Sequence, residues 1–121
     1  MELPKEKDIE IVSNENGTAY KFKNGLMIVT QRYEAVMSGL TTQWGGVYYG
    51  NAPIPPNFPV AFIEIPVITQ MIEANSSNAW LSSNSEANSK TRAPKVQIVR
   101  GNSLSSEATF YIDVIAIGKW K

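Results

Sequence analysis

The sequence contains neither cysteine nor histidine among its 121 residues. Without cysteine, no disulfide can stabilise the fold, and neither thiol catalysis nor a thiolate metal site is available. Without histidine, the chain lacks the commonest general base and the commonest zinc ligand, and it cannot form a Ser-His-Asp triad. The composition therefore removes the most frequent kinds of catalytic and metal site, and acidic side chains remain as the candidates for acid-base chemistry.

Excess charge and long apolar runs are also missing. The 11 Lys and Arg residues equal the 11 Asp and Glu residues in number, so the chain has no basic field for nucleic acid or an anionic membrane. The opening MELPKEKDIE is charged where a signal peptide would be apolar, and no run reaches the roughly 18 apolar residues of a membrane helix. We expect a protein made without a signal peptide, with no nucleic acid partner and no membrane insertion.

Length and segment order indicate one domain. A chain of 121 residues buries about two-thirds of its unfolded surface, which is enough for a single core. Residues 1–12 carry alternating charges and Pro4 before Ile9–Val12. We expect residues 1–12 to form a leader or junction that includes one short strand, and residues 13–121 to form a single β-sandwich domain.

The strongest β-pattern is the C-terminal stretch from Glu107 to Trp120, which β-branched and aromatic residues fill. One face is apolar nearly throughout and should point at a core, whereas the other carries Asp113 between Tyr111 and Ile115. Because so apolar a strand would invite aggregation at an exposed edge, we place it centrally, with strands on both sides. A carboxylate in such a strand needs a partner, and we expect a Lys or Arg on an adjacent strand or subunit.

An Asn-Gly pair predicts a hairpin early in the chain. Asn24-Gly25 lies between the alternating runs TAYKF and LMIVTQRYEAVM, which predicts a type I′ turn with positive φ at both central residues. Glu, Ala and Met in the second run also suit a helix, but Ile-Val-Thr at its start and the hairpin favour a strand. Both faces are largely apolar near the turn, which indicates burial on two sides.

The middle of the chain begins with a proline-rich segment. Four of the seven prolines lie between Asn51 and Phe62, so this segment cannot be a central strand and should cross the outside of the domain in extended form. Ile63–Ala74 fits a helical face as well as a strand, and Val-Ile-Thr favours the strand. With a further strand at 93–100, the chain totals about seven strands and no clear helix, which indicates an all-β antiparallel sandwich.

Two stretches combine aromatic residues with small or polar ones. Residues 38–50 read SGLTTQWGGVYYG, and their aromatic side chains either cap the core or form a glycine-flanked platform at the surface. Asn75–Arg92 is rich in Ser and Asn around Trp80 and Leu81. This stretch is either a solvated hairpin that those two residues anchor to the core or a recognition surface of adaptable polar side chains.

Acidic residues are the remaining candidates for catalysis. Glu64, Glu73, Glu107 and Asp113 lie in or beside expected strands, and two carboxylates across a groove can hydrolyse a glycosidic bond. Their spacing singles out no pair. The sequence also lacks a calcium-binding loop, a P-loop and a dinucleotide fingerprint. We therefore expect no catalytic residues, no metal and no cofactor, and hence not an enzyme.

Three separated segments share their order and spacing with a known family. Residues 16–28, NGTAYKFKNGLMI, resemble an "NG-x-y-K-f-x-dG-l-i-i" opening, and residues 116–120, AIGKW, are similar to an "xAIGrW" ending. Between them, Asn57-Phe58-Pro59, Phe62 and Pro66-Val67 are similar to a middle segment "FP-x-x-F-x-x-x-P-x-V". Together, from Asn16 onward, they resemble the C-terminal receptor-binding domains of bacteriophage and prophage tail fibres.

This resemblance implies a small β-sandwich at the distal tip of a fibre, as an intertwined or side-by-side homotrimer. It implies a place in the virion tail after production in the bacterial cytoplasm. Its partners would be a fibre shaft or baseplate and a polysaccharide or protein of the host surface. The matched residues would be architectural: Asn24, Gly25, Leu26, Phe58, Pro59, Gly118 and Trp120. Recognition would fall to variable loops, which gives as candidate ligand-binding residues Trp80, Tyr48, Tyr49, Asn78, Asn84 and Trp44.

The expected function is therefore non-enzymatic receptor binding by a tail-fibre tip. The alternative is a structural virion, baseplate or fibre-assembly module that binds only other phage proteins. A third hypothesis is a small glycan-depolymerising enzyme, which would depend on Asp113 or Glu73.

Overall fold

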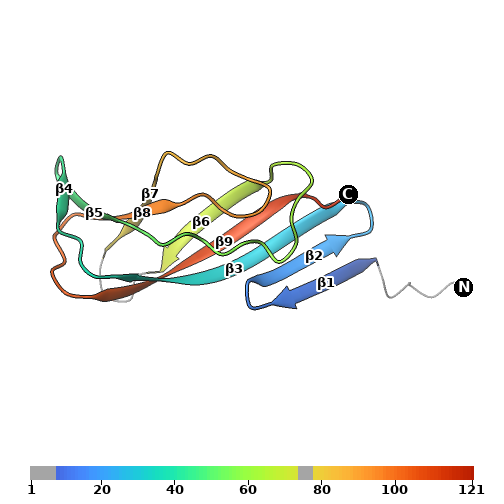
Figure 1. Ribbon diagram of the computed structural model, residues 1–121, viewed down its shortest axis with the longest axis horizontal. Coiled ribbons are helices and arrows are strands. Elements are labelled where there is room, and N and C mark those ends of the chain that lie inside the picture. Colours follow the sequence, from blue (N-terminus) through green and yellow to red (C-terminus); the bar gives the residue numbers. More distant parts are fainter. Residues whose placement is uncertain (1–7, 74–77) are drawn as a thin grey trace, which may run out of the picture.

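The computed structural model describes residues 8–73 and 78–121, in which strands form two antiparallel sheets (Figure 1). Residues 1–7 of the predicted leader lie outside the described residues, as do residues 74–77, where the predicted strand Ile63–Ala74 ends and the stretch Asn75–Arg92 begins. The strands are β1 (Ile9–Asn14), β2 (Gly17–Phe22), β3 (Leu26–Met37), β4 (Thr42–Trp44), β5 (Val47–Asn51), β6 (Val67–Glu73), β7 (Trp80–Ser83), β8 (Val96–Arg100) and β9 (Ala108–Lys119). The larger sheet has the order β1-β2-β3-β9-β6 and the smaller one the order β4-β5-β8-β7. The predicted all-β sandwich is confirmed.

The strands beyond the predicted number are β4 and β5. They form a hairpin within residues 38–50, where the sequence left strand and turn open. β1 pairs with β2 along its whole length, so it is part of the larger sheet and crosses residue 12, where the sequence placed the end of the leader. Within the described residues no helix is long and apolar enough to cross a membrane.

β9 lies inside the larger sheet with a strand on each side, as its apolarity predicts. It pairs with β3 from Leu26 opposite Lys119 to Met37 opposite Ala108, and β6 pairs with its other edge. Alternate side chains of β9, which include Ile112 and Val114, are buried between the layers. The remaining side chains of β9 face outward, away from the smaller sheet.

The hairpin between β2 and β3 is confirmed, but its predicted turn type is wrong. The loop has three residues, Lys23, Asn24 and Gly25, and of these only Gly25 has a positive φ, at +103°. The Gly25 N–H donates to Phe22 O at 2.9 Å, and the Asn24 side-chain oxygen accepts from Leu26 N at 3.0 Å. A turn closed in this way and followed by a left-handed glycine is the usual three-residue hairpin loop.

The proline-rich segment runs outside both sheets with Ile54 exposed, but two of its aromatic side chains also enter the core, which the sequence did not predict. Phe58 and Phe62 are buried, and their rings meet edge to face with centroids 5.2 Å apart. Phe58 N donates to Thr91 O at 2.7 Å, and Phe62 N donates to Lys90 O at 2.9 Å. The smaller sheet covers only one end of the larger sheet (Figure 1), so this segment and residues 84–95 cover the rest. Prolines exclude the segment from a strand ladder but not from the interior.

A buried glutamine on β3 holds this irregular layer in place. The Gln31 side chain is 5% exposed, and its Nε2 donates to Asn16 O and to Asn57 O, both at 2.9 Å. Carbonyl groups that have no strand partner thereby receive a donor. The amide connects the β1–β2 hairpin, β3 and the proline-rich segment.

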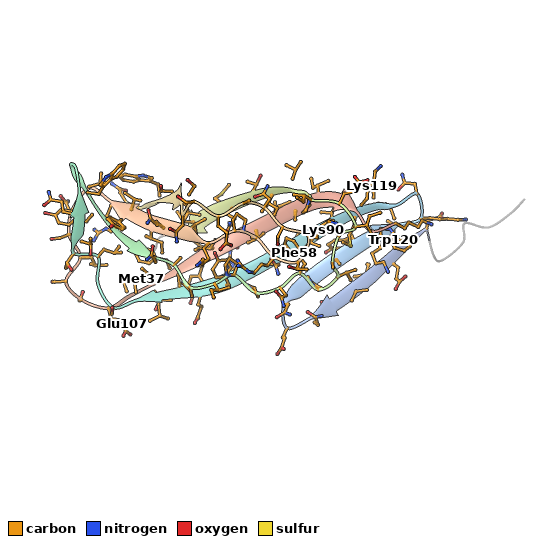
Figure 2. All side chains as sticks on the ribbon, turned by 45° about the horizontal axis from the view of Figure 1, so that its top comes forward. Met37, Phe58, Lys90, Glu107, Lys119 and Trp120 are labelled. Carbon is orange, nitrogen blue, oxygen red and sulfur yellow. The ribbon has the colours of Figure 1, made fainter. Side chains whose placement is uncertain are left out.

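Residues of the first and last segments of the tail-fibre resemblance meet at one end of the molecule. Trp120 N donates to Gly25 O at 2.9 Å, and Trp120 Nε1 donates to Phe22 O at 2.7 Å. Lys21 Nζ lies 4.3 Å from the centre of the Trp120 ring. Figure 2 shows Trp120 at this end and Met37 toward the other end. The chain therefore finishes beside its first long hairpin.

Phe62 and Pro66 of the middle segment of the resemblance pack against Gly118, near the same end of the molecule. A Cβ on Gly118 would lie 2.9 Å from the Phe62 ring and 3.1 Å from Pro66. Such a distance is too short for two carbon atoms, so glycine at this position allows Phe62 and Pro66 to pack directly on β9.

Candidate functional site

A groove lies on the outward face of the smaller sheet. It has a volume of about 510 Å³, and its walls consist of Trp44, Val47, Tyr49, Trp80, Ser82, Ser83, Gln97 and Val99. A volume of this size is typical of small-molecule sites, which span about 300–1,000 Å³. Every residue that the described part of the chain contributes to these walls is uncharged.

Strand register builds the centre of the groove. Tyr49 on β5 and Trp80 on β7 both lie opposite Val99 on β8, so the three side chains form one row on one face. Val99 is 6% exposed and forms the floor, whereas Trp80 is 45% exposed. Two large aromatic side chains thus stand on either side of a small aliphatic one.

The β4–β5 hairpin adds the most exposed aromatic residue of the groove. Trp44 is 76% exposed and lies opposite Val47 across a turn of two glycines. Gly45 has a φ of +58°, a conformation that residues with a Cβ rarely adopt. The turn keeps Trp44 at the rim, where its ring can contact a ligand instead of the core.

Polar side chains complete one side of the groove. Ser82 shares a face of β7 with Trp80, and Gln97 lies opposite Ser82 on β8, whereas the Ser83 side chain points to the other face. Gln97 Nε2 donates to Asn51 Oδ1 at 3.2 Å, which fixes the orientation of the amide. The groove therefore presents hydroxyl and amide groups beside aromatic faces.

The structure brings three of the predicted ligand-binding residues together. Trp44, Tyr49 and Trp80 line the groove, and their role in binding stays a prediction. Tyr48 points to the opposite face of β5, because successive strand residues alternate. Asn78 precedes β7 and Asn84 follows it, and neither lines the groove.

Sequence reasoning missed five residues of the groove: Val47, Ser82, Ser83, Gln97 and Val99. A signal for some of them was present, because Trp80 and Ser82 are two residues apart and so share a face, as do Val47 and Tyr49. Gln97 and Val99 depend on the pairing of β8 between β5 and β7, which joins segments far apart in the sequence. No local pattern reports that pairing.

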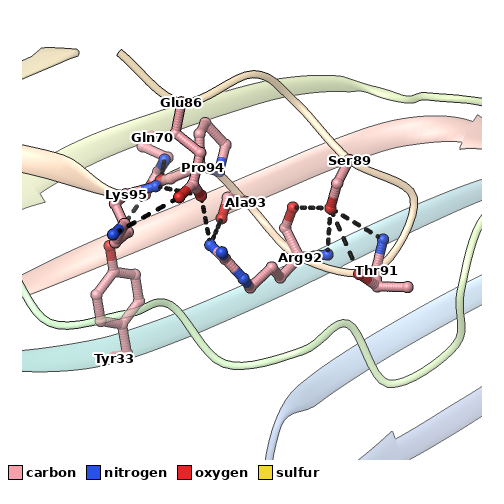
Figure 3. Close-up of polar contacts among 9 residues, drawn as sticks. All are labelled: Tyr33, Gln70, Glu86, Ser89, Thr91, Arg92, Ala93, Pro94 and Lys95. Atoms are coloured by element: carbon pink, nitrogen blue, oxygen red, sulfur yellow. Dashed lines mark hydrogen bonds and ion pairs between the residues drawn. The ribbon is translucent and has the colours of Figure 1, made fainter. Parts of the chain in front are cut away.

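The polar stretch after β7 makes side-chain hydrogen bonds among its own residues 86–95 (Figure 3). The Glu86 carboxylate accepts from the Arg92 guanidinium and from Lys95 N, and Lys95 Nζ lies 3.8 Å from its other oxygen. Ser89 Oγ accepts from Thr91 N and Arg92 N. These contacts give residues 86–95 a defined path over the larger sheet.

A buried tyrosine and a half-buried glutamine lie beneath this stretch. The Tyr33 hydroxyl donates to Gln70 Oε1 at 3.0 Å, and Gln70 Nε2 donates to Pro94 O at 2.8 Å (Figure 3). Burial raises the pKa of Tyr33 to about 12, because the phenolate form would lose its hydration. The hydroxyl therefore remains a hydrogen-bond donor at neutral pH.

Replacement of Glu86 by Gln should reduce stability at neutral pH and leave it nearly unchanged in acid. The Arg92 hydrogen bond, followed by the Lys95 backbone bond, lowers the pKa of Glu86 below its ordinary 4.5. The stabilisation is present above the unfolded pKa and disappears as pH falls through the lower folded pKa. Urea unfolding of both proteins at pH 7 and pH 3 should show the stability difference shrink. A difference that stays constant with pH would contradict this assignment.

The outward face of the larger sheet carries a second exposed feature. Five apolar side chains form a row across all its strands, in the order Ile11, Tyr20, Ile28, Ile117 and Val67. Ile11, Ile117 and Val67 are 61%, 44% and 73% exposed. The row spans four interstrand spacings, about 19 Å. A continuous apolar surface of this extent is typical of an interaction site, and we call it the sheet face.

The same outward face carries a compensated charge cluster, separated from this row by the row that contains Ile115. Arg32 Nε donates to Asp113 Oδ1 at 2.7 Å, and Arg32 Nη2 lies 3.0 Å from Glu73 Oε2. The hydrogen bond to Asp113 raises the pKa of Arg32, so the guanidinium stays charged. The predicted basic partner of Asp113 on an adjacent strand is confirmed. Within residues 8–73 and 78–121, no group of three or more acidic residues is placed to hold a metal ion.

Comparisons with known proteins identify the fold. No protein-family model matches the chain, and no protein of curated function matches its sequence. A solved structure of an N-truncated R1-type pyocin tail fibre aligns with a TM-score of 0.52 and 18% identity over 96% of this chain and 86% of that chain. A C-terminal part of the P. aeruginosa R1 pyocin fibre aligns with a TM-score of 0.52 and 15% identity over 96% of this chain and 28% of that chain. At these identities the likeness shows a shared fold.

Proposed function

We propose that this domain is the tip of a phage or phage-like tail fibre, where it forms a homotrimer and attaches the particle to the host surface. Two findings support a tail-fibre setting: the fold is shared with two pyocin tail-fibre structures, and the segments that resemble tail fibres meet at one end of the molecule. The number of copies follows from the resemblance. The proposed contact surface is the sheet face.

The sheet face is the observation that carries the proposal. Its apolar row crosses all five strands and lies opposite the core, so water would contact it in a single copy. Burial of such a surface is favourable at about 25 cal/mol per Å². A second copy is a suitable occupant, because the formal net charge is zero and Arg32, farther along the same face, is already paired with Asp113 and Glu73. Copies therefore approach without net repulsion.

The groove suits attachment because of where it lies. It is on the outward face of the smaller sheet, whereas the sheet face is the outward face of the larger one, so association leaves the groove open. The β4–β5 hairpin lies at one end of the molecule, and the start of β1, which begins at Ile9, and the C-terminus lie at the other (Figure 1). A fibre joined at the end with Ile9 would present the groove outward.

The proposed function is binding without catalysis. Asp113 and Glu73, the acids named for a glycan-depolymerising enzyme, contact Arg32 on the sheet face and not the groove. A second candidate is a structural module that binds only other phage proteins, which the sheet face alone would equally support. Binding of the purified domain to host cell envelopes separates the two. Release of reducing ends from a host polysaccharide, lost in Asp113→Asn, would instead favour the enzyme.

The test of self-association is the mass in solution. Light scattering should give three times the 13.4 kDa chain mass for the unchanged protein. Ile117→Lys should lower this mass to that of one chain, because the ammonium group would lose its hydration in the interface. Ile54→Lys is the matched control: Ile54 is also exposed, at 64%, but lies in the proline-rich segment on the other side. A monomeric unchanged protein would overturn the trimer.

A further inference from the structure

The groove combines three features that together select a class of ligand. Aromatic rings of Trp44, Tyr49 and Trp80 provide flat apolar faces, Ser82 and Gln97 provide hydrogen-bonding groups, and no lining residue is charged. We propose that the groove binds a ring of an uncharged sugar, a hexose or N-acetylhexosamine, between Trp80 and Tyr49. This inference rests on the proposed function for the source of the sugar, a host glycan, but its site is argued from the groove itself.

The aromatic pair suits the apolar face of a sugar ring. A pyranose carries C–H groups on its faces and hydroxyl groups around its edge. Trp80 and Tyr49 lie one strand to each side of Val99, so their backbones are two interstrand spacings apart, about 10 Å. A ring between them replaces water on both aromatic faces, and the electron-rich π surfaces attract the polarised C–H groups.

The polar side of the groove suits the hydroxyl edge of the same ring. Ser82 offers a hydroxyl group that donates and accepts, and the Gln97 amide is held by Asn51. A purely apolar ligand would cover these groups without replacing their bonds to water, at a cost for each unsatisfied group. The groove therefore favours a ligand with hydroxyl groups over a hydrophobic side chain of a partner protein.

Because the walls of the groove carry no charge, the groove should bind neutral sugars in preference to acidic ones. A carboxylate or phosphate in this groove would lose hydration without a Lys or Arg to pair with it. Arg32, Arg92, Lys21 and Lys95 are paired with acids elsewhere in the molecule, and none of them lines the groove. Neutral hexoses and N-acetylhexosamines fit the groove, and sugar acids do not.

The indole N–H signals of the 15N-labelled full chain provide a direct test. The sequence has three tryptophans, of which two line the groove, and Trp120 Nε1 is bonded to Phe22 O at the other end. The probes are methyl glycosides of glucose, galactose, mannose and N-acetylglucosamine, with glucuronic acid and N-acetylneuraminic acid as charged arms. We expect saturable shifts of Trp44 and Trp80 with at least one neutral sugar, an unmoved Trp120 signal, and no saturable shift with either acid.

Variants locate the site. Trp80→Ala should weaken binding of the neutral sugar by about tenfold or more, since a central aromatic contact contributes that much in binding sites. Trp80→Phe should restore most of the affinity. Tyr48→Ala is the matched control, because Tyr48 adjoins Tyr49 in sequence but faces away from the groove. In Trp80→Ala, the remaining indole signals of Trp44 and Trp120 report whether the fold is kept.

Three results would overturn the inference: no shift with any neutral sugar up to about 100 mM, where even weak sites are occupied; binding of the acidic sugars alone; or unchanged binding by Trp80→Ala. These outcomes are separable from failure of the proposed function. If the Trp80→Ala trimer still attaches to host cells, the sugar site is ruled out and the attachment role is kept. A monomer that binds neutral sugar in the groove would do the reverse.

Discussion

Phe58→Ala should lower the free energy of unfolding by about 3–5 kcal/mol, the usual range for removal of a buried phenylalanine. Phe58 is 5% exposed, and its ring meets Phe62 edge to face at 86°. Because the proline-rich segment has few backbone partners, the cavity would remove much of what holds this segment against the larger sheet. The same loss would weaken the anchoring of residues 84–95, which bond to the segment through Thr91 and Lys90.

Urea unfolding at pH 7 and one fixed protein concentration measures this effect, since association makes apparent stability depend on concentration. Ile54→Ala serves as the control, because Ile54 lies in the same segment but is 64% exposed. Its effect should stay within about 0.5 kcal/mol. Equal effects of the two substitutions would mean that the segment does not pack as described.

Gly17→Ala should destabilise the protein by about 2–5 kcal/mol. Gly17 has a φ of +125°, which costs an L-residue about 1–2 kcal/mol, and forced overpacking adds about 1–3 kcal/mol. A Cβ on Gly17 would collide with the carbonyl oxygen of Thr30 and lie 2.9 Å from Gln31 Cγ. The backbone of Thr30 cannot yield without disturbing β3, and Gln31 holds the proline-rich segment.

Gly101→Ala is the matched control for this substitution. Gly101 has no positive φ, and a Cβ there would meet nothing within 4 Å. Thermal unfolding of the two variants at equal concentration should show a large loss for Gly17→Ala and little change for Gly101→Ala. A small effect of Gly17→Ala would show that the β1–β2 hairpin can shift away from β3.

Strands that carry a regular alternation were predictable from the sequence. β9 alternates buried and outward residues along its length, and its place between two other strands followed from the risk of exposing it at an edge. The partner of Asp113 was predictable as a basic residue on a neighbouring strand, because an unpaired carboxylate there would be costly. These conclusions depend on local pattern and electrostatics, which a single sequence contains.

Features that have no periodic sequence pattern were not predictable in the same way. Prolines show that residues 51–62 cannot join a ladder, but they do not report which side of the segment faces the core, so the burial of Phe58 and Phe62 was missed. The Asn24-Gly25 turn was assigned the wrong type because the extra loop residue Lys23 changes the turn geometry without changing the hairpin. The far wall of the groove depends on β8 pairing with both β5 and β7, a long-range choice that no local signal contains.

The position of the chain ends has a consequence for how such a domain can change. Asp8 O accepts from Lys23 N, and Trp120 N donates to Gly25 O, so both ends of the described fold are tied to one hairpin loop. The β4–β5 hairpin and β7 lie away from that loop. Substitutions or insertions there can accumulate without disturbing the closure, so new ligand preferences can evolve, or be grafted as a cassette, on an unaltered base.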